Sequence, residues 1–221
     1  MMQNKWKDHY SKEARKLGYR ARSAFKLLEI QQKYKILRKG CRVLELGSAP
    51  GGWTQVICDL VLPGGDVLCV DIQNMKPIPG AEFVCADFKD LVFDDSEVQK
   101  DDENTPDNDK PSMPSKKLLH SKFDLVLSDM APNTTGDAFV DQHSSLNMLK
   151  ESWDLCSKAL KKGGGFLSKC FQSQEMHEFI KILKKSFSTA KIIKPKSSKS
   201  KSFELYIYCG GFNEAVYQEE F

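Results

Sequence analysis

Residues 43–53, with the sequence VLELGSAPGGW, decide the fold of this chain. The stretch begins as an apolar, strand-like segment, passes through a turn of small residues, and is expected to continue as a helix from Gly51. A strand that leads through such a turn into a helix brings the backbone close to a ligand at the carboxyl end of a parallel strand. The glycines favour this approach because they carry no Cβ atom. The stretch alone predicts a nucleotide-like ligand in an α/β fold.

The segments around this stretch alternate between strand-like and helical patterns. Strands are expected at residues 42–47, 66–72, 81–86, 123–129, 165–171, 190–194 and 203–209, and helices at 8–18, 21–34, 51–62, 144–160 and 175–187. The glycines at 163–165 are expected to end the fourth of these helices. The alternation predicts a doubly wound α/β sheet.

The length of 221 residues suits a single domain of this kind over residues 1–221. Within it, residues 1–40 predict a basic helical extension, and residues 213–221 a short tail. Residues 92–117 are rich in Asp, Asn, Pro, Ser and Lys. That composition predicts a disordered acidic insert between the third and fourth strands.

Hydropathy and cysteine usage bear on the compartment. The sequence shows neither an apolar run long enough to cross a bilayer nor a secretory signal, which predicts a cytoplasmic protein and no membrane partner. A mitochondrion or another organelle stays open as an alternative. The seven cysteines show no C-x-x-C spacing, which predicts reduced thiols and no metal site.

The net charge of +3 conceals a strong asymmetry. Residues 94–110 hold eight acids and two lysines, whereas residues 1–42 hold thirteen Lys and Arg and three acids. The run 181–201 adds eight lysines and no acid. Either basic block alone could be an ordinary solvated surface, but together they predict a polyanionic partner.

Three acidic residues restrict the class of ligand that the site is expected to bind. Asp71, Asp87 and Asp129 each follow an expected strand, and Asp71 lies where an acid accepts hydrogen bonds from ribose hydroxyls. The loop lacks both G-x-G-x-x-G and Walker A, because Gly47 and Gly51 are separated by Ser-Ala-Pro. A ligand with ribose and adenine but no pyrophosphate, S-adenosylmethionine, fits better than a nicotinamide cofactor. A nicotinamide-dependent oxidoreductase is the alternative from another enzyme class.

Several motifs then resemble those of a known family. They are GYRARSAFKL at 18–27, GSAPGGW at 47–53, SDMAPN at 128–133, SKCFQ at 168–172 and KPKSSK at 194–199, followed by Glu204 and Tyr206. The chain resembles the FtsJ/RrmJ-type ribose 2′-O-methyltransferases from about residue 8 to residue 210, apart from the insert. The resemblance implies a monomer with a Rossmann-like methyltransferase fold. In that fold a mostly parallel seven-stranded sheet has helices on both faces and an antiparallel last strand.

The resemblance also implies the site residues. The catalytic tetrad corresponds to Lys26, Asp129, Lys169 and Glu204. The positions expected to hold S-adenosylmethionine are Gly47, Gly51, Gly52, Trp53, Asp71, Asp87 and Asp129. The basic residues expected to contact RNA phosphates are Arg20, Arg22, Lys33, Lys35, Lys194, Lys196, Lys199 and Lys201.

The tetrad suits methyl transfer to a ribose hydroxyl. The enzyme must hold the methyl donor and the hydroxyl in line and remove a proton from a weak acid. A lysine can accept that proton only if its pKa is lowered, and a second lysine nearby would lower it. We expect Lys169 to act as base or proton-steering group and Asp129 to orient it, with Lys26 and Glu204 in support.

The SDMAPN motif resembles the branch that modifies a uridine in large-subunit rRNA. A tRNA anticodon-loop methyltransferase of the same family and a catalytically silent RNA-binding assembly factor are the alternatives. Departures from the family pattern spare the tetrad; they are Glu45, Ser48, Ser168, Cys170, Ser173, Lys199 and Lys201.

Overall fold

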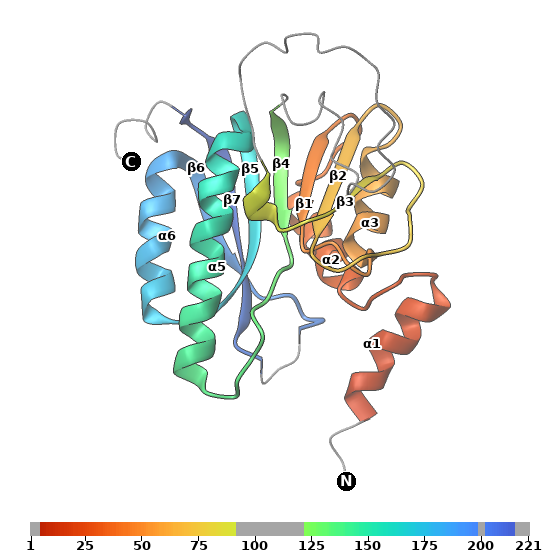
Figure 1. Ribbon diagram of the computed structural model, residues 1–221, viewed down its shortest axis with the longest axis horizontal. Coiled ribbons are helices and arrows are strands. Elements are labelled where there is room, and N and C mark those ends of the chain that lie inside the picture. The colour runs from red at the N-terminus through yellow and green to blue at the C-terminus, as the bar shows by residue number, and fades with distance from the viewer. Residues whose placement is uncertain (1–4, 92–121, 199–201, 215–221) are drawn as a thin grey trace.

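The computed structural model describes residues 5–91, 122–198 and 202–214 (Figure 1). Within these ranges seven strands form one sheet in the order β3-β2-β1-β4-β5-β7-β6. Their bounds are β1 Arg42–Leu46, β2 Asp66–Asp71, β3 Glu82–Cys85, β4 Phe123–Ser128, β5 Leu160–Phe171, β6 Phe187–Ile193 and β7 Glu204–Phe212. Neighbours pair in parallel from β3 to β5, and β7 pairs antiparallel with both β5 and β6. The predicted sheet, with its antiparallel last strand, is confirmed.

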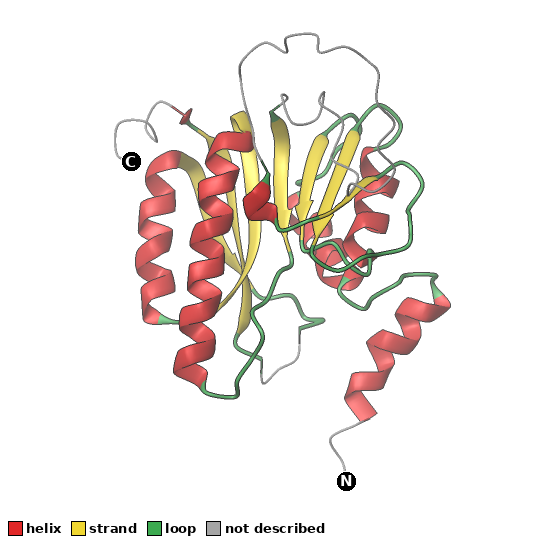
Figure 2. Cartoon of the chain, in the orientation of Figure 1, coloured by secondary structure: helices red, strands yellow, loops and turns green. Residues whose placement is uncertain are grey.

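Helices cover both faces of this sheet, as Figure 2 shows. One face carries α5 (Ala138–Ala159) and α6 (Gln174–Ser186), and the other carries α2 (Ala24–Tyr34) and α3 (Gly52–Val61). The helix α1 (Lys5–Lys16) precedes α2, and the short 3₁₀ helix η1 (Phe88–Asp90) follows β3. None of the described helices is long and apolar enough to cross a membrane.

Two apolar clusters form the core, one on each face of the sheet. Trp153 of α5 packs with Phe166 of β5 on the face that carries α5 and α6. Trp53 of α3 packs with Tyr206 of β7 on the other face. Successive side chains of a strand point to opposite faces, so the central strands need apolar residues at nearly every position. The burial of Val43 through Leu46 in β1 follows this rule. The sequence 43–53 therefore begins in the middle of the core.

The helix α5 begins at Ala138, six residues earlier than the sequence predicted. Asp137 lies just before it and accepts hydrogen bonds from the backbone N–H groups of Phe139 and Val140. Asp141 accepts a further bond from the backbone N–H of Thr135. These polar caps begin the helix before its apolar pattern starts, because they satisfy amide groups that have no partner within the helix.

The glycines 163–165 do not end a helix, and this prediction was wrong. The helix α5 already ends at Ala159, and β5 begins at Leu160 and includes all three glycines. The pairing between β4 and β5 shifts register between Phe123 and Leu125, and Gly163 has a φ of 81°. An irregular strand of this kind needs a residue that tolerates a left-handed backbone. Strand β6 also begins earlier than expected, and β7 ends later.

The predicted insert 92–117 and residues 215–221 of the predicted tail lie outside the described residues. The basic N-terminal region contributes to the core, because Ala24, Leu27 and Ile30 of α2 are buried. All seven cysteines are free thiols, as the sequence predicted.

Candidate active site at the carboxyl ends of the strands

The turn after β1 needs glycine at two positions. Gly47 has a φ of 74°, and a Cβ atom there would collide with the side chain of Met130. Gly51 has a φ of 104° and caps α3. The backbone N–H of Ala49 between them donates to Asp71 Oδ2 at 2.8 Å. The turn is therefore tied to the carboxyl end of β2.

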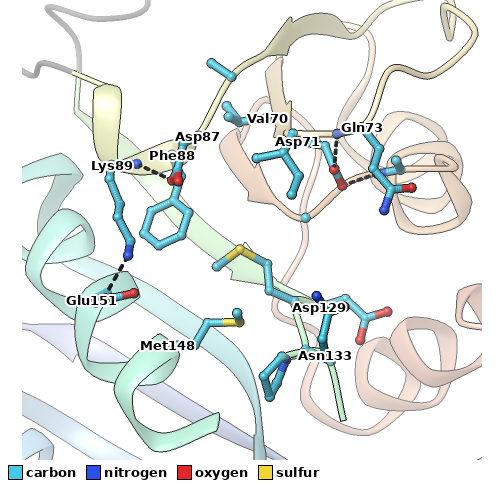
Figure 3. A pocket seen from close by; sticks show the side chains of 17 residues that line it. Val70, Asp71, Gln73, Asp87, Phe88, Lys89, Asp129, Asn133, Met148 and Glu151 are labelled. Carbon is cyan, nitrogen blue, oxygen red and sulfur yellow. Dashed lines mark hydrogen bonds and ion pairs between the residues drawn. The ribbon is translucent and has the colours of Figure 1, made fainter. Parts of the chain in front are cut away.

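A pocket of about 370 Å³ opens beside this turn, as Figure 3 shows. It lies at the carboxyl ends of β1, β2 and β4, which is where ligands bind in open α/β sheets. Its apolar walls include Phe88 and Met148. Four of the residues predicted to hold a cofactor line it: Gly47, Asp71, Asp87 and Asp129.

The other three predicted cofactor residues do not line this pocket. Gly52 faces Ala21 of the segment before α2, where a Cβ atom would come within 2.9 Å. Trp53 is 2% exposed, and its indole N–H donates to the carbonyl of Ser23 at 2.8 Å. Gly51 shapes the turn without facing the cavity. In this structure these residues join α3 to α2 and β7.

Backbone N–H groups orient Asp71 and Asp87, two of the acids that line the pocket. Asp71 Oδ1 accepts from the N–H of Gln73 at 2.8 Å, in addition to its bond with Ala49. Asp87 Oδ1 accepts from the N–H of Lys89 at 3.0 Å and caps η1. At the rim, Lys89 Nζ lies 2.8 Å from Glu151 Oε1 (Figure 3). Both aspartates thus have defined orientations around the cavity.

The four residues of the predicted tetrad form two ion pairs. Lys169 Nζ lies 3.1 Å from Asp129 Oδ1 and also donates to the Asp129 carbonyl. Lys26 Nζ lies 2.5 Å from Glu204 Oε1. The side chains come from α2, the end of β4, β5 and β7, and all four are at most 15% exposed. The fold therefore brings together four residues that the sequence spreads over 178 positions.

Tyr206 joins the two pairs, although the sequence-based list of site residues omitted it. Its hydroxyl donates to Asp129 Oδ1 at 2.6 Å, and Lys26 Nζ lies 5.8 Å from the centre of its ring. Antiparallel pairing places Lys169 of β5 opposite Tyr206 of β7. The signal in the sequence was the spacing of two between Glu204 and Tyr206, which puts both on one face of a strand.

Charge acts in opposite directions on two side chains of this group. Burial raises the pKa of Tyr206 well above its usual range, and the charges of Asp129 and Glu204 add to the rise. Its hydroxyl therefore remains a donor. Burial also opposes ionisation of Glu204, but Lys26, Lys169 and a hydrogen bond from Ser198 outweigh it, so the pKa of Glu204 is lowered.

A further carboxyl lies beneath the turn. Glu45 of β1 is 1% exposed; Thr54 Oγ1 donates to its Oε2 at 2.6 Å, and no residue that the structure describes forms a hydrogen bond with its Oε1. Burial raises the pKa of Glu45 to about 8, and Asp129 and Asp71 add to the rise against hydrogen bonds from Thr54 and Cys69. The group is a neutral acid at pH 7. Its signal in the sequence was an acid within an apolar strand.

The residues predicted to contact RNA have different surroundings. The guanidinium of Arg20 donates to the carbonyls of Lys76 and Pro77 at 2.5 and 2.8 Å, and that of Arg22 donates to the carbonyl of Ser197 at 2.7 Å. These two arginines hold loops together. Lys33, Lys35, Lys194 and Lys196 are exposed, and Lys199 and Lys201 lie outside the described residues.

Among the described residues, no group of three His, Cys, Asp or Glu is placed to hold a metal ion. The model of the FtsJ-like methyltransferase family matches residues 19–212 of the chain. A Coxiella burnetii (strain Dugway 5J108-111) protein named ribosomal RNA large subunit methyltransferase E is 41% identical over 215 residues, which cover 95% of this chain and 94% of the relative.

A Francisella philomiragia protein of the same name is 36% identical over 211 residues, covering 96% of this chain and 94% of the relative. Among solved structures, a protein from Plasmodium falciparum assigned as a ribosomal RNA methyltransferase superposes with a TM-score of 0.69. It is 26% identical, and the match covers 88% of this chain and 98% of that one.

Proposed function

This chain belongs to the FtsJ-like methyltransferase family, and from that premise we propose that it methylates the ribose 2′-hydroxyl of a uridine in large-subunit rRNA. The methyl donor is S-adenosylmethionine. We further propose that the protein acts as a monomer in the cytoplasm. The observation that carries the proposal is the pair of enclosed ion pairs, Lys169–Asp129 and Lys26–Glu204, beside the pocket that contains Asp71 and Asp87.

The pocket suits the proposed donor. Asp71 and Asp87 lie where ribose hydroxyls and an adenine amino group would find acceptors, and the three aspartates around the cavity favour a sulfonium cation, whereas the fourth carboxylate, Glu151, is paired with Lys89. The volume of about 370 Å³ falls within the range of small-molecule sites. S-adenosylmethionine supplies an activated methyl group, so the protein itself has to position the acceptor and manage a proton.

We assign the handling of the hydroxyl proton to Lys169. Asp129 holds the Lys169 side chain by both its carboxylate and its carbonyl, and Tyr206 holds that carboxylate in turn. Such a site accelerates the reaction by holding the reacting groups in position to within a few tenths of an ångström. As base, Lys169 takes the hydroxyl proton; as proton-steering group, it stabilises the negative charge that develops on the 2′-oxygen. The ion pair of Lys26 and Glu204 keeps charge beside Lys169 and restricts the motion of the surrounding side chains.

The test is to map ribose methylation across total RNA with and without this protein. We expect one 2′-O-methyluridine of large-subunit rRNA to disappear in its absence and to return when the purified protein is added with S-adenosylmethionine. Loss of a methyl group from a tRNA anticodon loop would assign the alternative branch. An unchanged map, together with cofactor binding, would indicate a silent assembly factor.

A further inference from the structure

Two adjoining cavities lie along α2, away from the cofactor pocket. The first, of about 470 Å³, lies between α2 and the end of β6, and the second, of about 480 Å³, lies at the amino ends of β1, β4 and β5. Tyr34 lines both. We call them together the α2 groove. It runs from Lys196, close to the loop that contacts Arg22 and Glu204, to Lys162 at the opposite end of the sheet.

The α2 groove is lined by seven cations and two acids. The cations are Lys33, Lys35, Arg38, Lys39, Lys162, Lys194 and Lys196. Both acids already have partners: Glu29 accepts from the backbone N–H groups of Lys196 and Ser197, and Asp124 pairs with Lys161 at 2.9 Å. In the described part of the chain, none of the seven cations forms an ion pair with a carboxylate. Counting only residues 5–91, 122–198 and 202–214, the groove therefore carries an excess of positive charge.

Tyr34 orders part of this charge. The ammonium groups of Lys33 and Lys191 each lie 5.2 Å from the centre of its ring, and the ring itself packs against Tyr208. Cation–π contacts of this kind limit the freedom of long side chains. Two lysines from different elements are thus held at the same place on the groove.

The far end of the groove is open. Among the described residues, no atom lies within 4 Å of the position that a Cβ of Gly163 would take, so a bulky ligand can approach this part of β5. Ile192 is the one exposed large apolar side chain among the lining residues, all of which the structure describes. A line of separate cations with so little apolar surface suits a chain of phosphates better than a protein partner, which would need apolar area to bury.

We propose that the α2 groove binds the sugar–phosphate backbone of RNA beyond the target nucleotide. One strand would then continue from the candidate active site along α2 to the amino end of the sheet. The groove extends the predicted RNA contacts by Arg38, Lys39, Lys162 and Lys191. The inference rests on the proposed function, since it names how the same substrate is held.

The test removes two cations at the far end, in the variant Arg38→Gln/Lys162→Gln. The probe is an unmethylated transcript of large-subunit rRNA. We expect its affinity to fall roughly tenfold, and the slope of log K against log salt to become shallower by about 1.4 to 1.8, since each of the two phosphate contacts contributes about 0.7 to 0.9. Cofactor affinity should stay at the wild-type value, because both residues are remote from the pocket.

The matched control is Lys181→Gln/Lys184→Gln, which removes the same charge from exposed positions on α6. This control should bind RNA nearly as the wild type does. Equal losses in the two double variants, or none in either, would overturn the proposal. Because affinity is measured without methyl transfer, a groove-dependent affinity in a protein that methylates no RNA would refute the proposed function and leave the groove assigned.

Discussion

Strands β4 and β5 carry a lysine–aspartate pair at each end. At the carboxyl end, Lys169 Nζ lies 3.1 Å from Asp129 Oδ1, and the two side chains are 9% and 14% exposed. At the amino end, Lys161 Nζ lies 2.9 Å from Asp124 Oδ1, with exposures of 41% and 35%. The residue types, the strands and the distances are nearly the same, so only the surroundings distinguish the two pairs.

The surroundings at the carboxyl end are supplied by other elements. Tyr206 of β7 donates to Asp129, and the pair Lys26–Glu204 joins α2 to β7 beside it. An exposed ion pair contributes little to stability. An enclosed pair costs free energy to desolvate, so its presence indicates a role other than stability. The two pairs therefore fit the proposed chemistry at the carboxyl end and an ordinary surface charge at the amino end.

The largest expected difference between the two ends is in activity. Lys169→Ala should lower the single-turnover rate of methyl transfer at least roughly 100-fold, the lower limit for loss of a positioned proton-transfer group. Lys161→Ala should stay within about twofold at saturating RNA, because that lysine contacts neither the pocket nor the tetrad. Binding of S-adenosylmethionine, measured by calorimetry, should be nearly unchanged in both. Comparable rates in the two variants would remove Lys169 from the mechanism.

Stability should separate the two pairs next. Asp129→Ala leaves the ammonium of Lys169 enclosed without its carboxylate partner, which costs about 3 kcal/mol in free energy of unfolding. Lys161→Ala breaks a pair in contact with water and should cost less than about 1 kcal/mol. Urea unfolding of both variants at pH 7 gives the two values. Equal losses would show that water reaches both pairs to the same extent.

The enclosed end also has a pH dependence through Glu45. Its pKa of about 8 exceeds the ordinary 4.5, so between these values the unfolded chain releases a proton that the folded chain keeps, and stability falls as pH rises. Glu45→Gln keeps an acceptor for Thr54 and cannot ionise. We expect its free energy of unfolding, relative to wild type, to rise by roughly 2 kcal/mol from pH 5.5 to 7.5.

Glu204 should behave in the opposite way. Its pKa is lowered, so it contributes stability above its unfolded pKa and loses that stability as the pH falls through its folded pKa. Glu204→Gln, measured below pH 4.5, serves as the control for the direction of the Glu45 effect. A pH-independent difference between wild type and Glu45→Gln would mean that Glu45 is ionised in the folded protein.

The sequence predicted much of this site, for identifiable reasons. Asp71, Asp87 and Asp129 could be placed together because the carboxyl ends of parallel strands meet at one edge of a sheet. Lys26 and Glu204 lie 178 positions apart, and only the family motifs joined them; hydrophobic periodicity carries no information about contacts between distant elements.

The predictions that failed depended on local geometry. The start of α5 is determined by the polar caps of Asp137 and Asp141, which an apolar pattern does not show. The glycines 163–165 have the composition of a helix end but occupy an irregular strand, since tertiary pairing with β4 decides their structure. Trp53 is a different case: its contact with a cofactor stays a prediction, and its side chain lies in the core, because a motif identifies a position without giving the orientation of the side chain.

The smallest expected effect tests the link between the two ion pairs that we propose to be catalytic. Tyr206→Phe removes the hydroxyl that donates to Asp129 at 2.6 Å and keeps the ring that packs on Trp53. Loss of a hydrogen bond to a charged group corresponds to about 1.5 kcal/mol, and hence to a rate roughly tenfold lower at saturating substrates. Tyr208→Phe, on the same face of β7 at the wall of the α2 groove, leaves the bond to Asp129 in place and should leave the rate at saturating substrates unchanged. If Tyr206→Phe lowers stability but not the rate, the hydroxyl serves the fold alone, and Asp129 is oriented by Lys169 without it.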